Sequence, residues 1–76
     1  MNAVTLYLNN GSTWNYELTS NTELYINMQD QDGTSLRLNK SDNKLYSYDC
    51  CNKEWKYMEN TSKMIDKVKI NQQEVS

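Results

Sequence analysis

The sequence predicts a small α+β domain, an antiparallel β-meander of about five to six strands with one short C-terminal helix packed on one face. Three observations lead to this fold class. The chain has 76 residues, the size of one small domain. Apolar and polar residues alternate with a period of two along most of the chain, as in half-buried strands. A helical spacing of apolar residues appears only near the C-terminal end.

The strand alternation occurs in separate segments of the chain. They are residues 4–8, 14–18, 24–28, 36–38, 45–48 and 55–58. Short polar turns lie between them. Asn10-Gly11 is a strong hairpin signal, and Gly33 can adopt positive φ at the end of a polar run. The segments are therefore expected to form hairpins in series.

The spacing changes in the C-terminal part, where Met64, Ile65 and Val68 fall on one stripe of a helix. Three good N-capping residues precede this stripe: Asn60, Thr61 and Ser62. A helix of about two to three turns is not stable alone, so it must pack on the sheet. Its expected partners in the core are Leu6, Leu8, Leu24, Ile26, Leu36 and Leu38. Residues 72–76 are expected to form a frayed tail.

The composition argues against an enzyme and against a metal or cofactor site. The chain has no histidine, the commonest general base and metal ligand at neutral pH. Cys50 and Cys51 have no second pair to complete a zinc site and no base to activate a thiol. The run 30–33 lacks the other acidic positions of a calcium loop. We therefore expect a protein that works by contact, with no catalysis, metal or cofactor.

The sequence also bears on location. It shows no long apolar run, and no basic region followed by an apolar stretch near the N-terminus. The lysines are interleaved with acids, so direct nucleic-acid binding is not expected. We predict a cytoplasmic protein, acting in a host cell and not on a membrane.

Charge is distributed unevenly along the chain. Residues 1–36 contain four acidic side chains and no basic ones, whereas residues 37–76 contain eight basic and six acidic ones. The four acids are Glu17, Glu23, Asp30 and Asp32. Because complementary potentials speed and select association, these acids are expected to face a basic partner.

The tyrosines suggest a second part of the same binding surface. If the aliphatic side chains of each strand face the helix, then Tyr7, Tyr25 and Tyr46 lie on the other face, one per hairpin. Tyrosine offers contact area and a hydroxyl group at low entropic cost. We predict that these tyrosines and the four acids bind a partner.

These features predict a small, non-enzymatic protein-binding protein. A phage or mobile element would use such a protein, for example as an anti-CRISPR, to block a host defence or nucleic-acid-handling protein by steric occlusion. One alternative is a carbohydrate-binding or surface module that uses Trp14-x-Tyr16 and Trp55-x-Tyr57. Another is a structural homo-oligomer subunit, such as a homodimer, whose second copy covers an edge strand.

Overall fold

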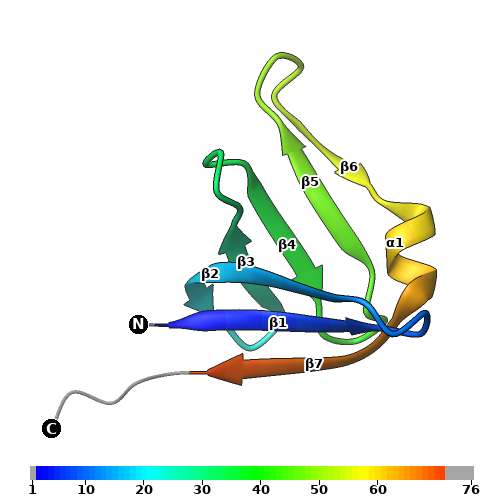
Figure 1. Cartoon of the computed structure of the whole chain (residues 1–76). Helices are drawn as coiled ribbons and strands as arrows, with labels where there is room; N and C mark the ends of the chain where they lie inside the picture. The colour runs from blue at the N-terminus through cyan, green and yellow to red at the C-terminus, as the bar shows by residue number, and fades with distance from the viewer. Residues whose placement is uncertain (1, 72–76) are drawn as a thin grey trace, which may run out of the picture.

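The computed structural model describes residues 2–71 and is mostly β, with a seven-stranded antiparallel sheet and one short helix (Figure 1). The elements are β1 (Ala3–Leu8), β2 (Thr13–Asn21), β3 (Tyr25–Gln29), β4 (Ser35–Asn39), β5 (Leu45–Asp49), β6 (Glu54–Tyr57), α1 (Glu59–Met64) and β7 (Ile65–Asn71). The strand order is β6-β5-β4-β3-β2-β1-β7. The first six strands therefore form the predicted meander, and β7 returns to the free edge of β1.

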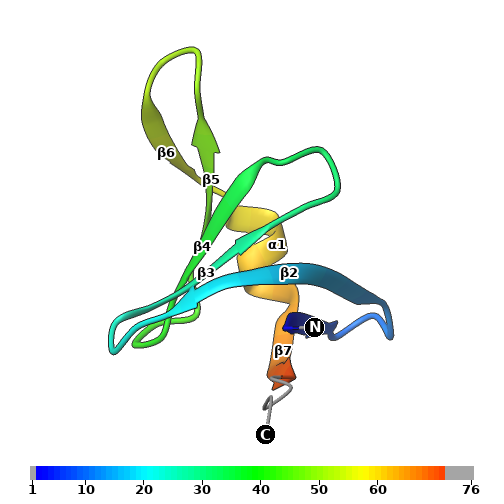
Figure 2. The ribbon, with the colours of Figure 1, turned by 90° about the vertical axis from the view of Figure 1, so that its left-hand side faces the viewer.

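The sheet is strongly coiled. In Figure 1, β1 and β7 run across the direction of β4 and β5, and Figure 2 shows the same crossing from the side. The register of β2 against β3 shifts between Leu18 and Ser20, and that of β1 against β7 shifts between Tyr7 and Leu8. Such irregularities bend strands and increase their twist. The coil brings one face of the sheet around its own apolar side chains.

The core lies on this enclosed face and follows from the strand register. Ile26 pairs with Leu38, and Leu38 pairs with Leu45, so alternate residues of β3, β4 and β5 point to the same side. The buried apolar side chains are Val4, Leu6, Leu8, Leu18, Ile26, Met28, Leu36, Leu38 and Leu45. Tyr16 and Val68 pack against this cluster from β2 and β7. We call the opposite side of the sheet the outer face.

The predicted turns are present and follow local chemistry. Gly11 and Gly33 have φ of 88° and 83°, a region that glycine adopts without steric cost. Asn10 Oδ1 accepts a hydrogen bond from the Ser12 backbone N–H at 2.9 Å. Asp30 Oδ1 accepts one at 2.9 Å from the N–H of Asp32 and another at 2.9 Å from that of Thr34. Both are polar turns of the kind that Asn and Asp side chains stabilise.

The C-terminal part differs from the sequence prediction, because a seventh strand takes the place of most of the expected helix. Ile65 and Val68 belong to β7, and none of the residues of α1 is buried. Val68 alternates with Ile70, and their partners in β1 are Leu6 and Val4. This pairing packs Val68 and Ile70 against the core and joins the backbone of β7 to the open edge of β1. The expected packing of the helix over one face is therefore not confirmed.

The helix also begins earlier than its expected caps. Asn60, Thr61 and Ser62 lie inside α1, and Met58 precedes its first residue. Ser62 Oγ donates to the Met58 carbonyl oxygen at 2.6 Å and accepts from the Leu45 N–H at 2.8 Å. This hydroxyl therefore ties α1 to the start of β5.

Three further expectations have different outcomes. Leu24 was expected in the core but is 65% exposed, because β3 begins only at Tyr25. The expected tail, residues 72–76, lies outside the described residues. Within the described part of the chain, no helix has the length and apolar character needed to cross a membrane.

The core assignment predicts different stability effects for two leucines of identical chemistry. Leu38→Ala should lower the free energy of unfolding by about 2–5 kcal/mol, because Leu38 is only 1% exposed and its removal leaves a cavity. Leu24→Ala is the matched control and should change it by less than about 0.5 kcal/mol. Urea denaturation followed by tryptophan fluorescence measures both. Equal effects of the two substitutions would contradict this core.

Candidate functional site

The outer face of β3, β4, β5 and β6 holds a group of aromatic side chains around one arginine. The group consists of Tyr25, Arg37, Tyr46, Tyr48, Trp55 and Tyr57, and we call it the aromatic patch. Its members share a face because Arg37 pairs with Tyr46, which pairs with Tyr57 on the next strand. Tyr48 and Tyr57 are 36% and 43% exposed. The patch is therefore a solvent-facing surface and not part of the core.

The rings of the patch pack in pairs. The Tyr46 and Tyr57 ring centroids are 5.7 Å apart, and those of Tyr48 and Trp55 are 5.1 Å apart in an edge-to-face arrangement. These separations lie in the favourable range for aromatic pairs. Four of the five rings therefore contact another ring, and Tyr25 contacts Arg37.

Arg37 connects the two sides of the patch. Its guanidinium carbon lies 4.5 Å from the ring centroid of Tyr25 on β3 and 4.3 Å from that of Trp55 on β6. Both distances are typical of cation–π contacts. Lys44 adds a second cation, with Nζ 5.4 Å from the Tyr57 ring centroid. The patch thus combines aromatic surface with positive charge.

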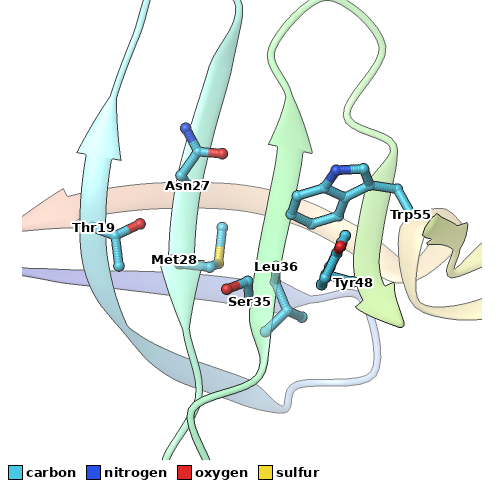
Figure 3. A pocket seen from close by; sticks show the side chains of 7 residues that line it. All are labelled: Thr19, Asn27, Met28, Ser35, Leu36, Tyr48 and Trp55. Carbon is cyan, nitrogen blue, oxygen red and sulfur yellow. The ribbon is translucent and has the colours of Figure 1, made fainter. Parts of the chain in front are cut away.

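A hollow of about 310 Å³ borders the patch. Figure 3 shows the Trp55 indole reaching across β5 toward β4, with Tyr48 beside it. Thr19, Asn27 and Ser35 line the hollow with neutral polar groups, and Met28 and Leu36 complete the lining. Asn27 Nδ2 donates to Ser20 Oγ at 2.8 Å, which holds the amide in place. Aromatic and neutral polar groups therefore meet in one shallow depression.

The structure places the three predicted tyrosines on the outer face but does not bring all three together. Tyr25 and Tyr46 are in the patch. Tyr7 lies under Lys67, whose Nζ is 5.6 Å from its ring centroid. Tyr7 pairs with the start of β2, whereas Tyr25 lies near its end. The two ends of β2 are roughly 26 Å apart at the usual rise per residue. Tyr7 is therefore separate from the patch.

The four predicted acids also divide. Asp30 and Asp32 lie in the turn after β3, and Glu17 pairs with Gln29 at the same end of that strand. We call Glu17, Asp30 and Asp32 the acidic end. Glu23 precedes β3 and so lies near its opposite end. Burial, and to a smaller extent the nearby Asp30 carboxylate, raise the pKa of Tyr16 beside this acidic end.

The acidic end and the patch are neighbours across the sheet. Gln29 pairs with Glu17 on one side and with Ser35 on the other. Ser35 in turn lines the hollow beside Trp55 and Tyr48. A partner that covers the patch would therefore also come close to the acidic end.

Sequence reasoning missed Arg37 and Tyr48, and it named Trp55 and Tyr57 only as a motif of the alternative carbohydrate-binding module. Their signal is present, since Arg37 alternates with the buried Leu36 and Leu38 and so must face outward. The two Trp-x-Tyr motifs, in contrast, are not equivalent. Trp14 pairs with buried Leu6 on the core side of the sheet, whereas Trp55 pairs with Tyr48 on the outer face.

The paired cysteines lie in the turn between β5 and β6 as free, exposed thiols. Asp49 Oδ1 accepts a hydrogen bond from the Cys51 N–H at 3.0 Å, which shapes this turn. Among residues 2–71, no three side chains of the His, Cys, Asp or Glu types come together as a metal site would require. Both cysteines are therefore exposed residues of a turn.

No protein-family model matches the chain, and neither the curated proteins nor the solved structures gave a match.

The hairpin of β5 and β6, which carries Trp55, contains an ion pair that changes the pKa of the Asp49 carboxyl group. Lys56 Nζ lies 2.9 Å from Asp49 Oδ2, and this contact, with a second hydrogen bond from Asn52, lowers the pKa of Asp49 from 3.8 to about 2. Because the folded pKa lies below the unfolded one, the pair stabilises the hairpin above about pH 4 and loses this effect as the pH falls through 2. Lys56→Met should raise the pKa of Asp49.

The measurement is an NMR titration of the Asp49 carboxyl carbon. Lys63→Met is the matched control, because Lys63 pairs with Glu59 at 2.9 Å and should leave Asp49 unchanged. If Lys56→Met does not move the Asp49 titration midpoint, the ion pair does not set this pKa.

Proposed function

We propose that this chain is a non-enzymatic protein-binding protein that covers a partner's surface with its aromatic patch. The observation that carries the proposal is the packing of five aromatic rings with Arg37 on a solvent-facing sheet surface. Tyrosine, tryptophan and arginine are the residue types most enriched at the energetic centres of protein interfaces. A contiguous exposed aromatic surface on a small protein is typical of an interaction site.

The contacts already present within the patch support this function. Binding is opposed by the entropy of ordering side chains, at about 0.5–1.5 kcal/mol for each flexible one. Here the Tyr48 and Trp55 rings already contact each other, and Arg37 is already stacked. A partner would therefore meet a surface that needs little further ordering.

The acidic end gives the proposed interaction a direction. Glu17, Asp30 and Asp32 lie beside the patch and would attract a partner with basic residues next to an apolar surface. Host proteins that handle nucleic acids have such basic surfaces. The proposed mechanism is steric occlusion of that surface by a phage- or mobile-element-encoded protein in the host cytoplasm.

The patch predicts which aromatic residues matter for binding. The test is affinity capture from host lysate, followed by measurement of the affinity for the purified partner. Tyr48→Ala and Tyr57→Ala should each weaken binding by about 30-fold, the usual effect at an interface centre. Trp14→Ala is the matched control, since Trp14 is as exposed as Tyr48, at 36%, but lies on the other side of the sheet. Trp14→Ala should leave the affinity unchanged.

Two results would contradict the proposal. One is capture of no partner by the wild-type chain. The other is a partner that binds the Tyr48→Ala and Tyr57→Ala variants as tightly as wild type.

The hollow beside Trp55 supports carbohydrate binding as a second candidate. Sugars stack on aromatic rings and hydrogen-bond to neutral polar groups, and this hollow offers Trp55 together with Asn27 and Ser35. A glycan array tests it, and Asn27→Ala should abolish any signal. The same variant should not affect a protein partner that binds through Tyr57, so the two candidates are distinguishable.

A further inference from the structure

We propose that Arg37 is the anchor that binds a carboxylate group, and that the partner places an acidic peptide segment on the aromatic patch. This inference rests on the proposed function, because it specifies what the patch recognises. The partner surface would then combine an acidic side chain at Arg37 with basic residues near the acidic end.

The first argument is the way in which Arg37 is held. Tyr25 comes from β3 and Trp55 from β6, so their rings approach the guanidinium from the two flanks of β4. Cation–π contacts of this kind do not need the guanidinium N–H groups as hydrogen-bond donors to an acceptor atom. The fork of N–H donors matches a carboxylate, which can accept two parallel hydrogen bonds.

The second argument is that the buried Nε of this arginine has no hydrogen-bond acceptor within residues 2–71. Arg37 Nε is buried and has no hydrogen-bond partner among the described residues. The acids that form ion pairs in residues 2–71 are engaged elsewhere, Asp49 with Lys56 and Glu59 with Lys63. A buried donor without an acceptor is unfavourable, so a carboxylate that gains access to Nε would remove an existing deficit as well as form a new contact.

The third argument concerns the kind of anion. The chain has a net charge of −2, and the acidic end lies close to the patch. A nucleic acid would bring a line of phosphates that needs a track of cations and would be repelled by this acidic end. Arg37 and Lys44 are two separate cations, and they fit one or two discrete carboxylates. The charge pattern therefore favours an acidic peptide over a nucleic acid.

The experiment uses the fact that Arg37 is the chain's single arginine, so its Nε–Hε NMR signal is unambiguous. The full chain is titrated with acetyl-Glu-Glu-amide, and separately with acetyl-Gln-Gln-amide, inorganic phosphate and a thymidine tetranucleotide. The diglutamate probe should shift the Arg37 Hε signal in a saturable way. The neutral diglutamine probe should not shift it.

A conservative variant separates the planar fork from charge alone. Arg37→Lys keeps the positive charge but loses the paired donors, and it should bind diglutamate about tenfold more weakly. The indole N–H signal of Trp55 reports binding in this variant. Lys69→Gln is the control, because it removes a cation from β7, at the far end of the sheet, and should leave the affinity unchanged.

Three results would overturn the inference: no saturable shift with diglutamate, equal affinity in Arg37→Lys, or a response of Arg37 to phosphate or the tetranucleotide at lower concentration than to diglutamate. The last result would assign a phosphate site instead.

If a protein partner depends on Tyr48 and Tyr57 but tolerates Arg37→Lys, the proposed function stands and the carboxylate anchor falls. If diglutamate binds through Arg37 while no partner protein is captured, the anchor stands and the proposed function falls.

Discussion

One sheet has to enclose the entire core of this protein, because its only described helix contributes no buried residue. The aliphatic side chains of β1 to β5 lie on a single face, and they leave water only if the sheet coils around them. The irregular register of β2 against β3 accommodates this bend. The same coil turns the opposite face of the sheet toward solvent. The core and the aromatic patch therefore depend on one period-two alternation.

Successive residues of a strand point to opposite faces of the sheet, so the position of a residue in this alternation decides whether it faces the core or the solvent. Trp14 is an even number of residues from buried Leu18 in β2, so it lies on the core side. Tyr48 is an odd number of residues from buried Leu45 in β5, so it faces outward. Trp55 pairs with Tyr48 and therefore also lies on the outer face. Two identical Trp-x-Tyr motifs thus have different environments. A short motif in a sheet acquires its meaning only through the strand that it pairs with.

The sequence was sufficient for those parts of the fold that local chemistry determines. The Asn10-Gly11 turn and the alternation of β3 and β4 are visible without any partner strand. The spacing of Met64, Ile65 and Val68 fits a helical stripe, but Val68 also alternates with Ile70 as in a strand, and a register shift places Ile65 opposite Leu8. The open edge of β1 decides between the two, and that edge is distant in sequence.

The candidate site shows the same division. The outward orientation of Tyr25 and Tyr46 follows from the alternation within their own strands, and the sequence prediction places both on the outer face. The contact between Arg37 and Trp55 is not local, because it depends on a tryptophan that reaches across an intervening strand. Nothing near either residue in the sequence indicates that contact. Isolation of Tyr7 from the patch likewise follows from the length of β2, which lies between them.

The pairing of the first strand with the last also has a consequence for synthesis. β1 is synthesised before the other described strands, yet one of its two neighbours, β7, ends at Asn71. Until then, Val4 and Leu6 lack the cover that Ile70 and Val68 provide. The growing chain can form its hairpins as they emerge, but its core stays open along one edge. Closure of this sheet therefore waits for the synthesis of β7, and a product truncated before β7 would expose a bare apolar strand edge.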